Sequence, residues 1–408
     1  MDFKNGANKA IEEAMIKDRY LHSSITADLL GQKMVFIGGP RQVGKTTLAQ
    51  VVGKHDYPHY AYLNWDSRED RKTILDGRYK GNAQLVIFDE IHKYKKWKNF
   101  VKGEFDKYRN TFAIIVTGSS RLDVYRKGGD SLMGRYHCYR LHPFSLAEVS
   151  GFIQKGNNPG GELHFAECGE KVRQYYDALF TYGGFPEPFL ARDMKVLRRF
   201  HNERVDRLVK EDIRDLENIR DLSALQILVE LLPGKVGSLF SLNSLKEDLQ
   251  VTHKSVSHWV DILERFYYHF RIYPYNAKLI KSLRKGPKLY LWDWSQVNDE
   301  AARLENIVAS HLLKFIHYLF DTEGYRCELF FLRDIERKEV DFLVTFDKKP
   351  WFAVEVKKSD SALSKELRYF AKKLDIPYAF QIVGSEHIDH YKEGIRIMSV
   401  EKFLAALV

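Results

Sequence analysis

The sequence predicts an α/β protein whose first part is built on a parallel β-sheet. Three short apolar runs, residues 33–37, 85–88 and 112–116, are each followed directly by glycine, carboxylate or hydroxyl residues. The first run leads through a glycine-rich loop into a helix-like stretch, which is the order of elements in a parallel sheet. A length of 408 residues exceeds one ordinary core and therefore indicates two or three domains.

The composition is that of a chain that folds throughout. Hydrophobic residues make up 44% and charged residues 29% of the chain, near the averages of globular proteins. No apolar run approaches the roughly 18 residues of a membrane span, and residues 1–20 form a charged helix pattern unlike a signal peptide. The three cysteines are widely spaced and indicate no disulfide framework. We therefore expect a soluble, cytoplasmic protein with no membrane partner.

The net charge of +9 comes mostly from the first part of the chain. Residues 1–165 carry 26 Lys and Arg against 18 Asp and Glu, whereas the remainder is nearly balanced. One basic cluster within that remainder has no acidic residue among its members: Lys278, Lys281, Arg284, Lys285 and Lys288. The cluster would suit contact with a phosphate backbone, or it would be a solvated loop or helix face.

Residues 33–47 carry the pattern of a phosphate-binding loop. A strand-like run is followed by a segment that fits G-x-x-x-x-G-K-[ST]: Gly39, Pro40, Arg41, Gln42, Val43, Gly44, Lys45, Thr46 and Thr47. The glycines let backbone N–H groups turn inward around phosphates, and the helix that follows adds positive potential. Lys45 would reach the β and γ oxygens, and the Thr46 hydroxyl would ligate Mg²⁺. We expect ATP and Mg²⁺ as cofactors.

A second strand-like run, residues 85–88, ends in the two carboxylates Asp89 and Glu90. Functional groups lie at the carboxyl ends of parallel strands, so Asp89 is expected beside the loop, where it would hold Mg²⁺ through water. Glu90 would orient or deprotonate the attacking water. A glutamate in this position favours ATP hydrolysis over transfer of the phosphoryl group to a small molecule.

A third run, residues 112–116, ends in hydroxyl residues. Thr117 is our first choice for a contact with the γ-phosphate or the attacking water, and Ser119 is the second. The alternative is a hydroxyl that merely caps a turn.

Four segments of the chain resemble the ATPase domain of a large bacterial and archaeal family of AAA-type ATPases: GPRQVGKTTL, LVIFDEIHK, VTGSSR and SLMGRYHCYRLHPFSLAEV. The resemblance covers nearly the whole chain and implies a C-terminal region related to restriction endonucleases. It also implies that Arg135, which precedes the strand-like run 136–141, reaches the γ-phosphate on a neighbouring subunit of a homo-oligomer. The alternative is a structural arginine paired within its own domain.

The middle of the chain has a helical pattern. Residues 156–161 indicate a loop and a domain boundary, and residues 182–188 contain the GGFPE element of the same family, which a tight turn explains. Residues 223–272 have the spacing of a helix-turn-helix, with the turn near residues 249–252 and Thr252 as the cap of the second helix.

This middle region is predicted to be a winged helix that contacts DNA. The residues that would make the contacts are His253, Lys254, Ser257 and His258 on the second helix, and Lys281, Arg284 and Lys285 after it. Because acidic and basic residues are balanced here, a protein-docking role remains the alternative.

The last part of the chain matches the PD-(D/E)xK pattern of nucleases. Asp341 and Glu355 would ligate Mg²⁺, and Lys357, two residues along the same strand, would stabilise the nucleophile or the developing charge. Glu305 would complete the metal shell, and Gln381 could assist. The pattern marks a fold more than it marks cleavage, because related domains also act as binding modules.

The predicted domains are an AAA-like P-loop ATPase domain over residues 1–155, a helical lid and winged-helix region over residues 156–295, and a restriction-endonuclease-like α/β domain over residues 296–408. Two functions fit this order of domains. The first is Mg²⁺-dependent ATP hydrolysis coupled to DNA binding or remodelling. The second is an ATP-controlled switch or scaffold that binds a protein partner and carries a degenerate nuclease-like domain.

Overall fold

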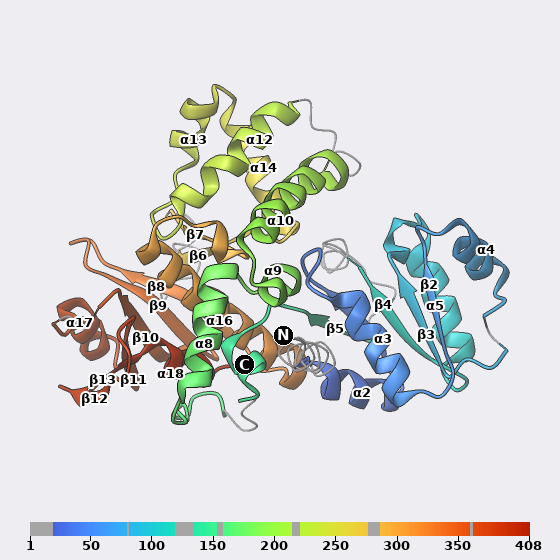
Figure 1. Cartoon of the computed structure of the whole chain (residues 1–408), viewed down its shortest axis with the longest axis horizontal. Coiled ribbons are helices and arrows are strands. Elements are labelled where there is room, and N and C mark those ends of the chain that lie inside the picture. The colour runs from blue at the N-terminus through green and yellow to red at the C-terminus, as the bar shows by residue number, and fades with distance from the viewer. Residues whose placement is uncertain are drawn as a thin grey trace, which may run out of the picture. The chain divides into compact units, whose positions relative to one another are not determined.

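The computed structural model describes residues 19–79, 81–118, 132, 134–152, 158–213, 221–275, 286–359 and 362–408. The chain divides into two compact units, Met1–Pro143 and Phe144–Val408. Figure 1 shows the elements of both. The domain ends predicted at residues 155 and 295 stay predictions.

The first unit is a five-stranded parallel sheet with helices. Its strands lie in the order β2-β3-β4-β1-β5, and every adjacent pair is parallel. The strands are β1 (Met34–Gly38), β2 (Tyr60–Asn64), β3 (Leu85–Asp89), β4 (Ala113–Thr117) and β5 (Tyr136–Arg140). The helices are α2 (His22–Leu30), α3 (Lys45–Asp56), α4 (Arg68–Asp76), the 3₁₀ turn η1 (Ile91–Lys93) and α5 (Trp97–Tyr108).

The three central strands of this sheet, β1, β3 and β4, are buried on both faces. Alternate strand residues such as Phe36, Phe88 and Val116 pack with Trp97 and Val101 of α5, while α2 and α3 contact β1, β3 and β4. Figure 1 shows α3 and α5 on opposite sides of the strands. A parallel sheet covered on both faces requires strands that are apolar throughout, which is why the strand-like runs are detectable in the sequence. The predictions of strands ending near residues 37, 88, 116 and 141 are confirmed.

The second unit is built on an eight-stranded mixed sheet in the order β12-β13-β11-β10-β9-β8-β6-β7. Its strands are β6 (His269–Pro274), β7 (Lys288–Leu291), β8 (Cys327–Arg333), β9 (Glu339–Phe346), β10 (Lys349–Lys357), β11 (Tyr378–Val383), β12 (Asp389–Lys392) and β13 (Ile395–Ser399). The long helix α16 (Glu300–Glu323) contacts β7, β8 and β10, and α17 (Lys365–Lys373) contacts β9, β10 and β11.

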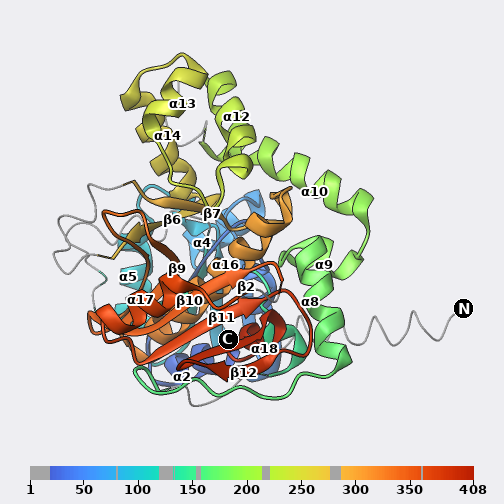
Figure 2. The same ribbon diagram turned by 90° about the vertical axis from the view of Figure 1, so that its left-hand side faces the viewer.

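The other elements of this unit are mostly helical. They are α7 (Leu146–Ser150), α8 (Glu170–Tyr182), α9 (Pro186–Ala191), α10 (Met194–Arg207), the π-helical η2 (Leu208–Ile213), α12 (Leu222–Leu231), η3 (Leu232–Lys235), α13 (Leu242–Leu249), α14 (His253–Arg265), η4 (Trp294–Gln296) and α18 (Val400–Ala405). Figure 2 shows α12, α13 and α14 together at one end, next to β6 and β7. The predicted helix-turn-helix boundaries are confirmed, because α13 ends at Leu249 and the Thr252 hydroxyl caps α14.

The GGFPE element forms the predicted tight turn between α8 and α9. Gly183 has a φ of 78°, and a Cβ there would lie 2.9 Å from both Asp293 Oδ1 and Ser295 Oγ. Phe185 is buried under the Arg204 guanidinium, which lies 4.1 Å from the ring centroid. Arg204 Nη1 is also 3.3 Å from Asp293 Oδ2. These contacts indicate that the residues of the GGFPE element serve to pack the turn against neighbouring segments.

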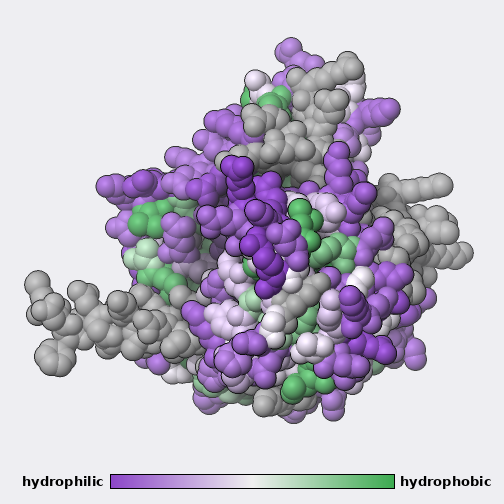
Figure 3. All heavy atoms as spheres, turned by 90° about the vertical axis from the view of Figure 1, so that its right-hand side faces the viewer, coloured by the Kyte–Doolittle hydropathy of each residue, from purple (hydrophilic) through white to green (hydrophobic). Residues whose placement is uncertain are grey.

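Within the described part of the chain, we find no helix with the length and apolarity that crossing a membrane would require. Figure 3 shows one face of the molecule, on which hydrophilic side chains cover most of the coloured surface and hydrophobic ones occur in small groups.

Candidate functional site

The glycine-rich loop joins β1 to α3 in a tight curve. Gly39 has a φ of 144°, and a Cβ there would lie 2.4 Å from the Leu141 carbonyl oxygen. Any side chain at this position would therefore push the loop away from the segment that follows β5. The backbone curls around the Lys45 side chain, whose Nζ donates to the carbonyl oxygens of Gly39 at 3.1 Å and Pro40 at 2.7 Å. Lys45 is held by backbone carbonyls here.

The order of the strands brings polar side chains to this loop. β4 lies between β1 and β3, and Asp89 is in register with Thr117 on one side and with Asn64 on the other. The Thr46 hydroxyl donates to Asp89 Oδ2 at 2.9 Å, and the Thr117 hydroxyl donates to Asp89 Oδ1. Lys45, Thr46, Asp89 and Thr117 thus lie at one edge of the sheet.

Glu90 follows Asp89 with a left-handed backbone, φ 55°, and its backbone N–H donates to the Thr117 carbonyl oxygen at 3.1 Å. Its Oε2 lies 3.6 Å from His92 Nε2 and 3.5 Å from Lys93 Nζ. Burial raises the pKa of Glu90 above its ordinary value, and Lys45 and Lys93 offset part of that rise. A carboxylate with a raised pKa accepts a proton more readily, which suits a general base.

These residues fit a magnesium nucleotide. A P-loop site supplies few protein ligands for Mg²⁺, because phosphate oxygens and waters complete the octahedron. The Thr46 hydroxyl and the Asp89 carboxylate are hard oxygen donors already in contact. Lys45, next to them, supplies a cation for the β and γ phosphates.

The sequence did not reveal two further residues of this site. Tyr62 on β2 donates its phenol proton to Asp89 Oδ2 at 2.7 Å. The buried Arg19 donates to the carbonyl oxygens of Val43, at 2.9 Å, and His142, at 2.6 Å, so it lies beneath the loop. Neither the second tyrosine of YAYLN nor the arginine before α2 is part of a motif that would have identified it.

Arg135 is not brought together with Lys45. It precedes β5, and β5 pairs in parallel with β1 from Met34↔Tyr136 onward. Arg135 therefore lies at the edge of the sheet opposite the loop, about 15 Å from it along the strands. Its guanidinium contacts Asp106 of the same chain, with Nε 2.7 Å from Oδ1 and Nη2 3.3 Å from Oδ2. A role on a neighbouring subunit stays a prediction.

The predicted DNA-contact residues of α14 lie near its capped start. His253, Lys254 and His258 are exposed and Ser257 is partly exposed. Several other predicted residues lie outside the described part of the chain: Ser119, Lys278, Lys281, Arg284 and Lys285.

The carboxylates of the last part of the chain gather near the ends of β9 and β10. Lys357 Nζ lies 2.5 Å from Glu355 Oε1, as expected for residues two apart on one strand face. Glu355 is in register with Gln381 on β11, whose Oε1 accepts from the Ser364 N–H at 2.8 Å. Asp341 Oδ2 accepts from the Val356 N–H at 2.9 Å.

Lys288, a member of the predicted basic cluster, lies among these carboxylates. For Lys288, both expected settings of the basic cluster, a phosphate contact and a solvated face, were wrong, because its side chain is 3% exposed and bound to acids. Lys288 Nζ is 2.8 Å from Glu339 Oε1, 3.1 Å from Glu305 Oε1 and 3.4 Å from Asp341 Oδ1. The run of basic residues in the sequence could not show that the pairing of β7 with β6 buries the Lys288 side chain.

The titration of this acidic cluster follows from its burial. Burial and the neighbouring Asp341 carboxylate raise the pKa of Glu305 to about 7 and that of Glu355 to about 8. Although burial lowers the pKa of Lys288, the carboxylates of Glu305, Asp341 and Glu339 raise it above its ordinary value.

These residues do not fit the metal ion that a PD-(D/E)xK nuclease requires. Such an ion would take oxygen ligands from Glu305, Asp341 and Glu355. The Lys288 ammonium already contacts Glu305 and Asp341, as well as Glu339, and the Lys357 ammonium contacts Glu355. Among the residues that the structure describes, no group of three or more His, Cys, Asp or Glu is arranged to hold a metal ion.

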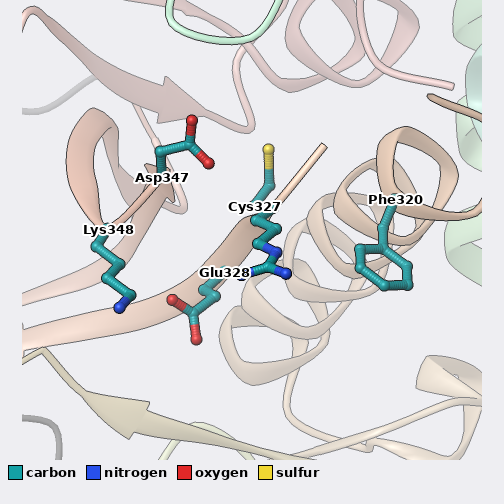
Figure 4. Close-up of a pocket in the computed structure, with 6 residues that line it drawn as sticks. Phe320, Cys327, Glu328, Asp347 and Lys348 are labelled. Carbon is teal, nitrogen blue, oxygen red and sulfur yellow. The ribbon is translucent and has the colours of Figure 1, made fainter. Parts of the chain in front are cut away.

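A hollow of about 420 Å³ lies at the other end of the same strands (Figure 4). Its lining residues are Phe320, Arg326, Cys327, Glu328, Asp347 and Lys348. Asp347 follows the end of β9, whereas Asp341 is near the start, about 20 Å away along the strand. Burial raises the pKa of the Cys327 thiol to about 12, so this thiol stays protonated at neutral pH. We assign no chemistry to this hollow.

Three family models match successive parts of the chain. Residues 31–150 match an AAA domain, residues 173–304 match a domain of unknown function (DUF8612), and residues 301–403 match a second domain of unknown function (DUF4143). The first match agrees with the parallel sheet and its loop. The first unit has a P-loop NTPase fold, and residues 31–150 are similar to an AAA domain.

The similar proteins are themselves uncharacterised. The Methanocaldococcus jannaschii protein MJ1544 is 24% identical over 407 residues, which cover 94% of this chain and 88% of that protein. The Mycobacterium tuberculosis protein Rv2008c is 24% identical over 262 residues, or 64% of this chain. The match spans 54% of Rv2008c.

Similarity to solved structures is low. The Thermotoga maritima RuvB Holliday junction branch migration motor has a TM-score of 0.31 at 15% identity, with 64% of this chain and 89% of that chain covered. The Pif1 helicase from Bacteroides in complex with ADP-AlF3 and single-stranded DNA has a TM-score of 0.20 at 12% identity, with 40% and 56% covered. TM-scores this low support no functional conclusion.

Proposed function

We propose that this protein hydrolyses ATP in the presence of Mg²⁺ at the loop between β1 and α3. One observation carries the proposal. Asp89 accepts hydrogen bonds from the hydroxyls of Thr46 and Thr117, so the phosphate-binding loop, β3 and β4 meet at one carboxylate. Glu90 is the next residue, at the position from which a base would face the same edge of the sheet.

Each residue has a distinct role in this proposal. Lys45 would leave the carbonyls of Gly39 and Pro40 and bind the β and γ phosphates. Thr46 and Asp89 would hold Mg²⁺, which neutralises phosphate charge when it is bound. Thr117 keeps the Asp89 carboxylate oriented. Glu90 would take a proton from the attacking water, and its raised pKa, which burial causes, favours that transfer.

The proposed partner of the second unit is DNA. The support is α14, whose capped start presents His253, Lys254 and His258 to solvent after a short turn from α13. Helices α12 to α14 followed by β6 and β7 have the order of a winged helix, and β7 bridges to Leu239 and Val236. Hydrolysis would be coupled to binding or remodelling of DNA.

A homo-oligomer belongs to the same proposal. Arg135 lies at the edge of the sheet away from its own loop, so any γ-phosphate that it contacts would be on a neighbouring subunit. Its pairing with Asp106 would have to open for that contact.

The second candidate function is an ATP-controlled switch that binds a protein partner. Lys288 favours it, because its ammonium contacts carboxylates that a nuclease would use to hold a metal ion.

An ATPase assay with single-stranded, duplex and branched DNA tests the proposal, together with a mass measurement in ATP. Stimulation by one DNA form, lost in Lys254→Ala with basal hydrolysis unchanged, supports the DNA-coupled function. Hydrolysis that no DNA alters supports the switch. Absence of hydrolysis under every condition contradicts both forms of the proposal.

The oligomer has its own test. When subunits carrying Glu90→Gln are mixed with subunits carrying Arg135→Ala, some interfaces combine an intact Glu90 with a neighbour's intact Arg135. Recovery of hydrolysis in the mixture supports action between subunits. If hydrolysis does not recover, Arg135 has a structural role in its pair with Asp106.

A further inference from the structure

The ammonium of Lys288 occupies the middle of the acidic cluster on α16 and β9. Glu339, Asp341 and Glu305 each place a carboxylate oxygen between 2.8 and 3.4 Å from Nζ. Glu305 is on α16, whereas Glu339 and Asp341 are on β9. The lysine therefore links two distant elements, as a metal ion bound by all three carboxylates would. Their oxygens are the donors that a divalent ion would use.

The position of Lys288 is fixed by the backbone. It is the first residue of β7, in register with Ile272 on β6, and a bridge pairs it with Leu239. Tyr290, two residues further and therefore on the same face of β7, donates its phenol proton to Glu305 Oε1 at 2.6 Å. A side chain that begins on a paired strand and ends 3% exposed differs from a mobile surface lysine.

The other oxygens of the cluster are also engaged. Glu355 Oε1 lies 2.5 Å from Lys357 Nζ, Asp341 Oδ2 accepts from the Val356 N–H, and Glu339 also pairs with Arg333. An incoming metal ion would have to displace Lys288 and leave its ammonium buried without a partner. A buried charge without its partner is strongly destabilising, which weakens metal binding at this place.

We infer that Lys288 takes the place of the divalent metal ion in this nuclease-like cluster, so that the domain holds no catalytic metal there and does not cleave DNA by metal-activated water. The inference goes beyond the proposed ATPase and does not depend on it, since no residue of the phosphate-binding loop takes part. It assigns the cluster a structural role that joins β7, α16 and β9.

The test counts Mn²⁺ ions bound to the full chain without nucleotide, by electron paramagnetic resonance. All samples carry Thr46→Ala, which removes the metal-binding hydroxyl of the loop. The protein with Lys288 is expected to bind no Mn²⁺ at the cluster. Lys288→Ala is expected to gain a site for about one ion, because the three carboxylates then lose the cation that they share.

Two further variants test where the gained ion binds and whether the positive charge of Lys288 is what excludes it. Lys288→Arg keeps the positive charge and is expected to gain no ion. Lys288→Ala combined with Asp341→Asn is expected to lose the gained ion. Gain of the same ion by Lys288→Arg, or its retention after Asp341→Asn, overturns the inference.

A parallel measurement decides the case in which Lys288→Ala fails to fold. Mn²⁺ binding is then compared between the Lys288 protein and its Asp341→Asn variant. Equal absence of binding supports the inference, and an ion that Asp341→Asn removes overturns it. A folded Lys288→Ala that gains no ion also overturns it. Since ATP hydrolysis is not the readout, failure here is distinguishable from failure of the proposed function.

Discussion

The two units each contain a cluster of carboxylates next to a lysine, and the clusters differ in what the lysine contacts. In the first unit, Lys45 donates to backbone carbonyls, and the hydrogen bonds to Asp89 come from hydroxyls of Thr46, Tyr62 and Thr117. In the second unit, Lys288 contacts three carboxylates directly. The same residue types therefore leave one cluster ready for a cation and neutralise the other.

The largest expected effect concerns Glu90. Glu90→Gln removes the proposed base while leaving the loop intact, so turnover of ATP should fall by about 10²–10⁴-fold with nucleotide affinity nearly unchanged. Lys45→Ala should lose ATP binding itself. Steady-state hydrolysis and binding of a fluorescent ATP analogue measure the two quantities. An equal loss of binding in both variants would contradict the assigned roles.

The second effect compares the two lysines by stability. Lys288→Met leaves buried carboxylates without their cation and should lower the free energy of unfolding by about 3–5 kcal/mol. Lys45→Met removes an ammonium that donates to two carbonyl oxygens and should cost less, about 1.5–3 kcal/mol. Denaturant unfolding of the nucleotide-free protein measures both. Equal losses would mean that the two lysines are held alike.

The third effect is the pH dependence of stability. Burial and Asp341 raise the pKa of Glu305 to about 7 and of Glu355 to about 8, so between about pH 4.5 and 8 the folded state binds more protons than the unfolded state. The contribution of these groups to stability is therefore fully present at low pH and is lost as pH rises through that window. Thermal unfolding at pH 5 and pH 8 should show a smaller decline in Glu355→Gln. An unchanged decline would contradict the raised pKa.

The smallest effect concerns Tyr62. Tyr62→Phe removes one hydrogen bond to Asp89 and should raise the Mg²⁺ concentration for half-maximal hydrolysis by less than about tenfold. Tyr60→Phe, on the same strand, is the matched control and should change nothing. An equal rise in this Mg²⁺ concentration in both variants would mean that the Tyr62 hydroxyl has no specific effect on the metal site.

The sequence predicted the first unit closely because its signals are local. Strands buried on both faces are continuous apolar runs, and the phosphate-binding loop is a contiguous motif, so Lys45, Thr46, Asp89 and Thr117 could be found by position. The Arg19 and Tyr62 contacts depend on tertiary packing between segments and were missed.

The second unit was less predictable because its cluster joins distant segments. Glu355 and Lys357 share a strand face by simple spacing, but the meeting of Lys288 with Glu305 and Asp341 depends on where β7 lies relative to α16 and β9. Because the nearby residues in the sequence are basic, Lys288 was predicted to be exposed.

The first cluster is expected to take up a metal ion together with nucleotide, and the second cluster is expected to take up none. Counting the Mn²⁺ ions bound to the unmodified chain, with and without a non-hydrolysable ATP analogue, measures this difference. We expect about one tightly bound ion with the analogue and none without it. A tightly bound ion that is present without nucleotide and disappears in Asp341→Asn would contradict it.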